Sequence, residues 1–469
     1  MRNAADRDIP RYCRMSLILL LPGIISLILV LRGRIETAFL SVYLPALLLL
    51  PETYSIRLPH FPPTSAAEFA LIPIGIVGLL RLVRSGSFAL MDFLVTFFAF
   101  SVGLSEILHA PVLNDAIFSA MNAFISFVLA YMVGRQLIEP DLRFTTVRRF
   151  VILMLLLGPA GLYEWKMGQS LYGMFGDRVL GISANESVQL RGGHGRMASA
   201  FSGAEPAGIA FAMTACLNAW LVYLKKVKAQ VNFGKTLDKL EQYHVPGILL
   251  LLYVWLSQSR GPQLAVLAGY LILQIPRFKN TKMMTVVVAI LLVVAYLGAT
   301  AYFAAYTNIS DPNAVSEQQS SAMYRRLMNE LYAPIAAEGG WTGWGLIGIP
   351  HIAGLTSIDN HFLLVHLAWG RLAYILFVLI TWENIRVLLV RSWQFKSTQD
   401  RAFAFSMMAA MAVLWIALLT VYLGEQLPQV AFLLIGWVQS MKPGKPMTSA
   451  GVQITENQNQ KFAFRRVFG

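Results

Sequence analysis

The sequence is poor in charged residues and in cysteine. Only 13% of its 469 residues are charged, and only two are cysteine. A soluble domain carries about 25% charged residues, so this composition argues against a soluble protein. Cys13 precedes the first hydrophobic run and Cys216 lies inside another, so we expect no disulfide between them and no metal site at either.

Motifs of several soluble enzyme classes are lacking too. The sequence has no glycine-rich phosphate loop of the nucleotide-binding type and no cluster of residues at metal-ligand spacing. It also has no obvious internal repeat. We therefore expect one integral membrane domain over residues 1–469, with neither a cofactor nor a metal.

Long hydrophobic runs, in contrast, are abundant. Hydrophobic residues make up 56% of the chain, in continuous blocks of about 15–21 residues. In lipid every backbone N–H and C=O must bond within the protein, so continuous blocks of this length favour helices. We predict an all-α polytopic membrane protein with thirteen hydrophobic segments, of which about twelve span fully. The segments cover residues 16–31, 37–50, 66–80, 88–108, 116–134, 149–163, 203–224, 245–258, 262–276, 283–303, 361–381, 402–423 and 427–440.

Basic residues give the chain a net charge of +13 and lie mostly in short connections between hydrophobic segments. Lys and Arg mark the cytoplasmic side of a membrane protein, so the charge indicates topology rather than a nucleic-acid partner. These connections and the tail, 441–469, contain Arg143, Arg148, Arg149, Lys225, Lys226, Lys228, Lys235, Lys239, Arg277, Lys279, Lys282, Arg386, Arg391, Lys442 and Lys445. The two longest connections, 164–202 and 304–360, then face outward. Arg2, Arg7, Arg11 and Arg14 favour a cytoplasmic N-terminus, whereas thirteen spans would place it outside, and both options stay open.

Arg260 follows a hydrophobic segment almost without a loop, between Ser259 and Gly261. No Asp or Glu occurs between Glu241 and Asp311, so Arg260 has no acidic partner nearby in sequence. Arginine in hydrocarbon costs on the order of 2.5–3.5 kcal/mol, which favours either an anionic ligand or an extended side chain that reaches the interface.

Arg196 ends the first outer connection after several glycines, which let backbone approach a ligand closely. Ser202, Glu205 and Pro206 follow at the start of the next hydrophobic segment. Pro and Glu suit the first turn of a helix, so Glu205 has an ordinary structural explanation. Arg196 is equally well explained by a pair with Glu205 and by contact with a ligand.

The second outer connection, 304–360, contains an amphipathic helix. Its apolar residues recur at helical spacing on one face, which is typical of a helix on a membrane surface. They are Tyr324, Leu327, Met328, Leu331, Tyr332 and Ile335. Arg326 is explained by a surface pair with Glu330, four residues later. Arg325 has no such partner in the helix, which makes it the better candidate for ligand contact.

The same connection ends in Asp359, Asn360 and His361, at the start of the next hydrophobic segment. A histidine titrates near neutral pH, and an aspartate can orient it or act as a base itself. Either Asp359 or His361 is therefore a candidate base, although a lone histidine at a helix start is usually structural.

Taken in order, these motifs resemble the bacterial O-antigen ligase/polymerase superfamily, whose members are integral-membrane class C glycosyltransferases. The resemblance covers about residues 190–380. The motifs that carry it are Arg196 with Ser202–Pro206, Ser259–Gly261, Tyr324–Arg325, Gly343–Gly345, Ile358–Phe362 and Trp369–Gly370. Asn360 precedes His361, an order that looks more like the polymerases than the ligases.

The resemblance implies a metal-independent, inverting glycosyltransferase of surface polysaccharide synthesis, in the bacterial inner membrane and active at its periplasmic face. The implied donor is an oligosaccharide on a polyprenyl diphosphate, the acceptor is a glycan or lipid-linked glycan, and a flippase and a chain-length regulator are the implied protein partners. The implied site has Arg196, Arg260 and Arg325 at the diphosphate, His361 or Asp359 as the base, and Glu205, Tyr324, Asn360 and Ser259 in support.

Two other functions fit a polytopic membrane protein. A flippase or secondary transporter of lipid-linked glycans needs polar groups at mid-membrane, and Asp92 and Glu106, near the two ends of one segment, suit that function. A non-enzymatic partner of an export complex would need no converging arginines. The concentration of ionisable residues at the outer mouth favours the transferase.

Overall fold

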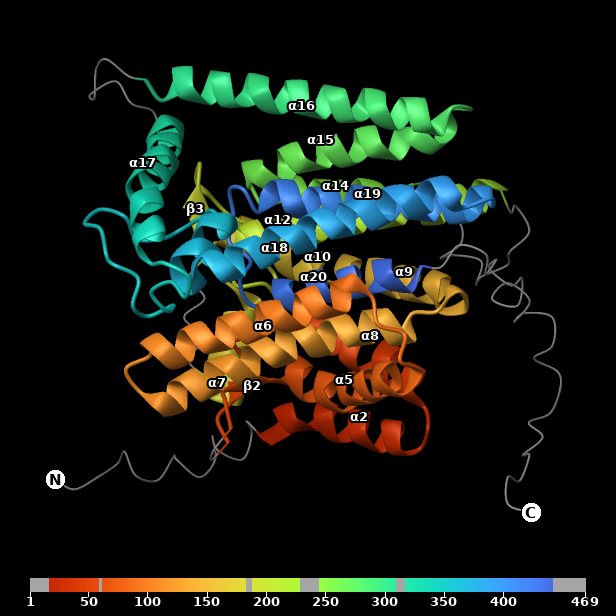
Figure 1. Ribbon diagram of the computed structural model, residues 1–469, viewed down its shortest axis with the longest axis horizontal. Coiled ribbons are helices and arrows are strands. Elements are labelled where there is room, and N and C mark those ends of the chain that lie inside the picture. Colours follow the sequence, from red (N-terminus) through yellow and green to blue (C-terminus); the bar gives the residue numbers. More distant parts are fainter. Residues whose placement is uncertain (1–16, 59–60, 183–187, 228–243, 309–316, 442–469) are drawn as a thin grey trace.

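A computed structural model describes residues 17–58, 61–182, 188–227, 244–308 and 317–441. Most of these residues are helical (Figure 1). The sheets in these ranges are two antiparallel hairpins: β1 (Ser55–Ile56) pairs with β2 (Thr64–Ser65), and β3 (Leu190–Arg191) pairs with β4 (His194–Gly195). The predicted all-α fold is confirmed.

The α-helices are α2 (Leu21–Leu31), α3 (Ile35–Ala38), α4 (Leu44–Leu49), α5 (Ala66–Ser85), α6 (Leu90–His109), α7 (Leu113–Ala123), α8 (Ala130–Leu137), α9 (Arg143–Leu156), α10 (Gly158–Met167), α11 (Leu171–Phe175), α12 (Ala204–Val227), α14 (Val245–Leu256), α15 (Arg260–Gln274), α16 (Thr281–Tyr306), α17 (Glu317–Glu338), α18 (His361–Gln394), α19 (Thr398–Ala417) and α20 (Gln426–Ser440). Single π-helical turns join α3 to α4 (Phe39–Tyr43) and α7 to α8 (Phe124–Leu129).

Eight helical segments in the described ranges are long and apolar enough to cross a membrane. They are Ala66–Ser85, Leu90–His109, Leu113–Leu137, Pro140–Met167, Ala204–Leu224, Thr281–Tyr306, His361–Gln394 and Thr398–Ala417. Shorter apolar helices cover Leu17–Leu31, Ile35–Leu49 and Val245–Leu256. These helices fit a polytopic membrane protein, and the number of about twelve spans stays a prediction.

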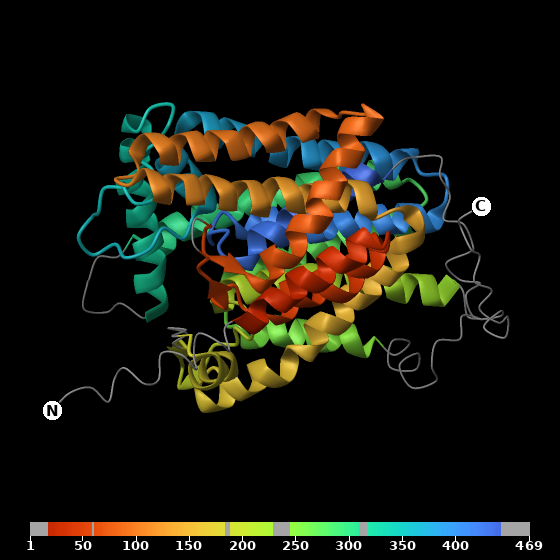
Figure 2. The same cartoon turned by 90° about the horizontal axis from the view of Figure 1, so that it is seen from below.

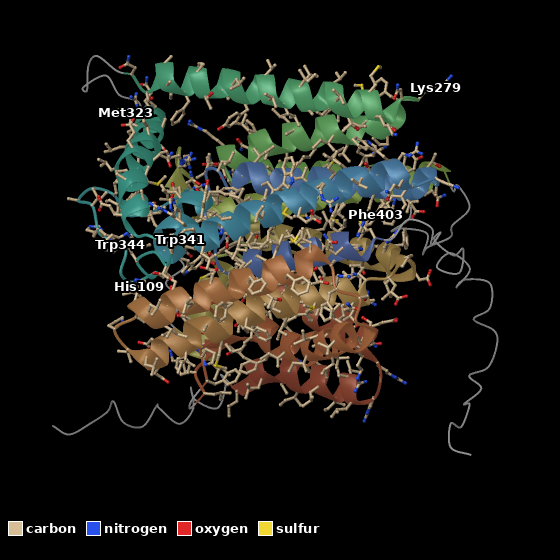
Figure 3. The ribbon with its side chains drawn as sticks, viewed as in Figure 1. His109, Lys279, Met323, Trp341, Trp344 and Phe403 are labelled. Carbon is tan, nitrogen blue, oxygen red and sulfur yellow. The ribbon has the colours of Figure 1, made fainter. Side chains whose placement is uncertain are left out.

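The long helices lie side by side, so their connections gather at two ends of the bundle (Figure 1 and Figure 2). The α17 end carries α17, both hairpins and the side chains of Met323, Trp344 and His109 (Figure 3). The Lys279 end carries Lys279 and the start of α9. Those basic connections that the structure describes lie at the Lys279 end, as one-sided topology requires. Residues 228–243 and 442–469, which carry the rest of that prediction, lie outside the described residues.

The described chain begins at the α17 end. Leu19 packs with Tyr54, Ile56 and Ala66, beside β1 and β2. From there α2 runs towards the Lys279 end (Figure 1). The arginines that favour a cytoplasmic N-terminus, all before Leu17, lie outside the described residues.

α20 forms the centre of the bundle. Every residue from Gln426 to Gln439 is buried. Gly134 of α8 and Gly436 of α20 allow the two helix backbones to touch, because a Cβ on either glycine would overlap the backbone of the other helix. The segment just before α20 reaches the predicted site, because the Leu423 amide donates to the His361 ring.

α18 is broken at Gly370, whose φ of 79° and ψ of −173° are not helical. The preceding connection fills the break. The amides of Trp344 and Gly345 donate to the carbonyls of Leu367 (3.0 Å) and Ala368 (2.8 Å). Irregular backbone at membrane depth needs such protein partners. The glycine motifs 343–345 and 369–370 therefore meet in space.

Glu106 of α6 fixes this insertion. Its side chain is buried, and Oε1 accepts from the Leu346 amide and from Trp369 Nε1, each at 2.9 Å. Asp92, at the other end of α6, accepts from the Ala89 amide at 2.7 Å and pairs with Arg135. Asp92 and Glu106, the two carboxylates that would suit a transporter, thus both bond to groups of the protein itself.

Two details differ from the predicted helices. The sequence predicts a helix over 402–423, but α19 ends at Ala417 and a loop, 418–425, follows at the α17 end. In α17, Met328, Tyr332 and Ala336 are buried, whereas Leu327 and Leu331 are 48% and 38% exposed. The buried stripe is narrower than predicted because it contacts one layer only, formed by α18 and the connection before it.

Candidate functional site

Tyr324 and Arg325 of α17 contact the segment that precedes α18. Arg325 Nε lies 3.6 Å from Asp359 Oδ2, and the two side chains are 27% and 29% exposed. The helix itself gives Arg325 no acidic partner, as predicted, but Asp359 supplies one. Tyr324 Oη donates to the Ser357 carbonyl and accepts from the Ser357 amide, each at 2.8 Å. Burial alone would raise the pKa of Tyr324, but hydrogen bonds with Ser357 and Thr356 outweigh it and lower that pKa.

Asp359 and Asn360 tie the start of α18 to α17. Asp359 Oδ1 accepts from Ser357 Oγ at 2.8 Å. Asn360 caps α18 by accepting from the Leu363 amide, and its own amide nitrogen donates to Asn329 Oδ1, both at 3.3 Å. The carboxylate of Asp359 is thereby held in place while it stays partly exposed beside a cation.

His361 is enclosed by protein. Its side chain is 4% exposed, and its ring packs edge-on against Phe377 with centroids 5.0 Å apart. Nδ1 accepts from the Leu423 amide at 3.2 Å. In a neutral imidazole whose Nδ1 accepts a hydrogen bond, Nε2 carries the hydrogen. This arrangement leaves no lone pair on His361 for a substrate proton, and the geometry favours Asp359 as the base.

Arg196 has its guanidinium occupied by protein groups. Nη2 lies 2.6 Å from Glu205 Oε1, so the pair considered from the sequence is confirmed. Nε donates to the Ser257 carbonyl at 3.2 Å, and Nη1 donates to Gln189 Oε1 at 2.5 Å. Arg196 therefore holds the turn between α14 and α15 in place.

Arg260, the first residue of α15, follows that turn with Ser259 as N-cap. Its side chain is exposed and forms no hydrogen bond or ion pair with the described part of the chain. A guanidinium beside the free N–H groups of a helix start attracts anions. Of the three predicted arginines, Arg260 and Arg325 are the two with donors left for a ligand.

The loop 418–425 joins the motifs to one another. The carbonyl of Leu418 accepts from the His361 amide at 3.0 Å, and Leu423 bonds to the His361 ring. A Cβ on Gly261 would lie 2.7 Å from Thr420 Oγ1, so the start of α15 touches the same loop. The motifs around Arg196, Arg260 and Arg325 thus lie at one end of the bundle, rather than on unrelated faces.

Sequence reasoning missed this loop and two of its residues, Tyr422 and Glu425. Burial raises the pKa of Tyr422, and the carboxylate of Glu425 raises it further, with smaller effects from Glu205 and Asp359. The signal that could have identified the loop is Gly424-Glu425-Gln426, a glycine and two polar residues that interrupt the hydrophobic stretch.

Within the part of the chain that the structure describes, no three His, Cys, Asp or Glu side chains are placed to hold a metal ion. The chain matches no protein-family model, and no curated protein matches it. The membership in the O-antigen ligase/polymerase superfamily therefore stays a prediction from the motifs.

Proposed function

We propose that this protein is a membrane glycosyltransferase that polymerises polyprenyl-diphosphate-linked oligosaccharide units during bacterial surface polysaccharide synthesis. The reaction takes place at the α17 end, which faces the periplasm in the inner membrane. One observation carries the proposal: two arginines with free donors, Arg260 and Arg325, share that end with the partly exposed carboxylate of Asp359, and contacts through the loop 418–425 link their segments.

The proposed reaction is a single inverting displacement. A hydroxyl oxygen of the acceptor sugar bonds to the anomeric carbon of the donor sugar, on the face opposite the diphosphate. The bond from that carbon to the diphosphate oxygen breaks, and polyprenyl diphosphate leaves with the electron pair. Asp359 takes the hydroxyl proton.

The arginines supply the main electrostatic contribution. Negative charge grows on the leaving diphosphate, and guanidinium groups match phosphate oxygens with paired hydrogen bonds. Arg260 and Arg325 contact the diphosphate, while Arg196 and Glu205 hold the turn that presents Arg260. Donors fixed before the reaction stabilise this charge without reorganisation, and one such donor contributes about 100- to 1000-fold in rate.

The test uses the purified protein in nanodiscs with a polyprenyl-diphosphate-linked repeat unit. We expect longer lipid-linked glycan without nucleotide and in the presence of EDTA, resolved by gel electrophoresis. Arg260→Ala and Arg325→Ala should each lower the initial rate about 100-fold or more.

Arg326→Ala is the matched control, because Arg326 lies on the same helix but is paired with Glu330. It should extend the glycan at the wild-type rate. An intact donor that yields no product with the wild-type protein, or full-length polymer from folded Arg260→Ala and Arg325→Ala variants, would overturn the proposal.

A further inference from the structure

A second polar cluster lies under the loop 418–425, where α20 begins. It consists of Glu52, which follows α4, and of Glu425 and Gln426 at the start of α20; we refer to these three residues as the Glu52 cluster. Buried oxygens of all three lack a hydrogen-bond partner among the described residues: Glu52 Oε2, Glu425 Oε2 and Gln426 Oε1. Gln426 is 1% exposed. A buried polar atom without a partner is destabilising, so such a group calls for a partner that the described chain does not supply.

Contacts place the three residues together. Gln426 Nε2 donates to the Leu50 carbonyl, two residues before Glu52. Burial raises the pKa of Glu52 well above its ordinary value, and the carboxylates of Glu68 and Glu425 raise it further. Burial also raises the pKa of Glu425. The three unpaired oxygens therefore belong to residues that lie close together, and no basic residue of the described chain acts on the two carboxyl groups.

The Glu52 cluster continues into the candidate site. Tyr422 lies within electrostatic reach of Glu425 and, more weakly, of Glu205 and Asp359. The Ser202 hydroxyl lies beside Glu425 and Tyr422 and lowers the pKa of both, although it forms no well-aligned hydrogen bond with either. The Glu52 cluster thus adjoins Tyr422 and Ser202, two residues at the same end of the bundle as the candidate site.

We propose that the Glu52 cluster binds the hydroxyl groups of an uncharged sugar of the acceptor glycan, an inference that rests on the proposed function. Sugar hydroxyls are donors, and unpaired carboxylate and amide oxygens are the acceptors that they need. No basic residue of the described chain acts on the cluster, so it offers no cation to the diphosphate of the donor or to the carboxylate of an acidic sugar, which leaves an uncharged sugar as the ligand that fits it. Since Tyr422 is within electrostatic reach of both Glu425 and Asp359, we place a sugar bound at the cluster on the acceptor side of the proposed site.

The test measures binding rather than turnover. The probe is the unphosphorylated repeat-unit oligosaccharide released from the source bacterium's polysaccharide, titrated against the protein in nanodiscs by calorimetry. Glu52→Gln and Glu425→Gln should each weaken binding at least tenfold and raise the KM for the acceptor, with the KM for the lipid-linked donor unchanged. Glu330→Gln, an exposed carboxylate on α17, is the control and should bind as the wild type does.

A second measurement needs no variant. A water-soluble carbodiimide with an amine nucleophile labels carboxyl groups, and mass spectrometry reads the modified residues. The oligosaccharide should protect Glu52 and Glu425 of the wild-type protein, but not Glu330. Equal labelling with and without the oligosaccharide, or wild-type affinity in both Gln variants, would mean that the Glu52 cluster holds water alone and would overturn the inference. If the oligosaccharide protects both residues but the protein never extends a lipid-linked glycan, the proposed function is refuted. The sugar-binding site would then still stand.

Discussion

The two ends of the bundle use the same kinds of charged residue in opposite ways. At the Lys279 end, Arg135 Nε lies 3.3 Å from Asp92 Oδ1, and the side chains are 8% and 3% exposed. At the α17 end, Arg325 and Asp359 are 3.6 Å apart and more than a quarter exposed. A buried ion pair is stable only when its remaining donors and acceptors form hydrogen bonds with other protein groups. An exposed pair leaves some of its donors and acceptors free to bind a ligand.

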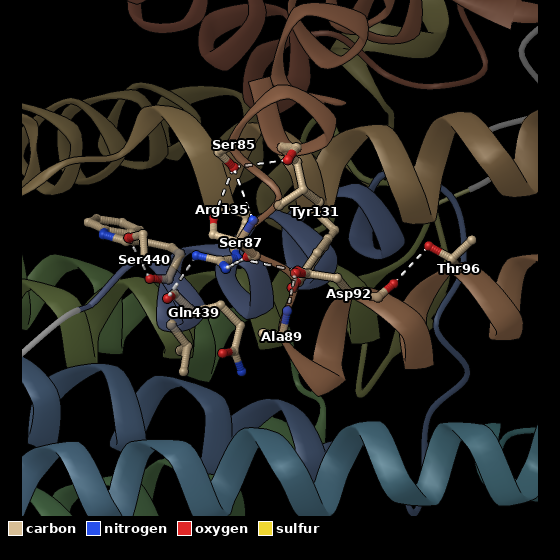
Figure 4. A network of polar contacts seen from close by, with 12 residues as sticks. Ser85, Ser87, Ala89, Asp92, Thr96, Tyr131, Arg135, Gln439 and Ser440 are labelled. Carbon is tan, nitrogen blue, oxygen red and sulfur yellow. Dashed lines mark hydrogen bonds and ion pairs between the residues drawn. The ribbon is translucent and has the colours of Figure 1, made fainter. Parts of the chain in front are cut away.

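Asp92 and Arg135 form such additional hydrogen bonds with protein groups around them (Figure 4). Asp92 also accepts from the Ala89 amide and the Tyr131 hydroxyl. Arg135 donates to the carbonyls of Ser87 and Gln439, at 3.2 and 3.4 Å. The network therefore ties α6 and α8 to the end of the central helix. This ion pair holds the bundle together, whereas Arg325 and Asp359 at the α17 end stay partly exposed.

Arg135→Ala should give the largest change in stability that the comparison predicts. It leaves the Asp92 carboxylate buried beside Tyr131 without its cation, which typically costs about 3–5 kcal/mol. We expect a lower midpoint of unfolding in detergent, measured by tryptophan fluorescence, and a smaller yield of monodisperse protein. The rate of glycan extension per folded molecule should stay at the wild-type value.

Arg325→Ala is the matched variant for stability at the other end. An exposed ion pair contributes about 0–1 kcal/mol, so its unfolding midpoint should stay close to that of the wild type. The contrast between the two ends would fail if this variant were destabilised as strongly as Arg135→Ala.

Glu106→Leu should have an intermediate effect. It removes the acceptor of the Leu346 amide and of Trp369 Nε1, and each buried donor left unpaired costs about 1–3 kcal/mol. Hydrogen exchange of the amides around Leu346 should accelerate, because the connection no longer stays fixed in the break of α18. Glu106→Gln keeps one acceptor oxygen and should show a smaller acceleration; unchanged exchange in the Leu variant would show that the glycines alone hold the insertion.

The sequence predicts features that depend on neighbours in the chain. Hydrophobic runs located the long helices. Short spacing predicted the pair of Arg326 with Glu330 and gave the pair of Arg196 with Glu205 as one of two explanations. Helical geometry brings Arg326 and Glu330 together because they lie four residues apart, and Arg196 lies only nine residues before Glu205.

Features that depend on packing between distant segments were missed. The partner of Arg325, the insertion of residues 343–345 into the break at Gly370, and the loop 418–425 all arise where separate segments meet. The mean hydropathy stays high through Thr420 and Tyr422, because Val421 and Leu423 lie between and after them. The predicted segment therefore continues to residue 423, beyond the end of α19. The amide of Leu423 instead bonds to His361, a choice that only the assembled bundle can set.

Arg326→Ala should have the smallest effect and gives the sharpest test of how the α17 end works. Arg326 Nε lies 2.7 Å from Glu330 Oε1, both side chains are largely exposed, and Nη1 donates to Thr307 Oγ1 at 3.3 Å. An exposed pair one helical turn apart contributes about 0.3–0.5 kcal/mol, and less at high salt, because ions screen it. We expect stability and glycan extension close to the wild type, whereas Arg325→Ala, one residue away, loses extension. Equal loss in both variants would show that the donor is held by the summed positive charge of α17, and the specific role of Arg325 beside Asp359 would have to be abandoned.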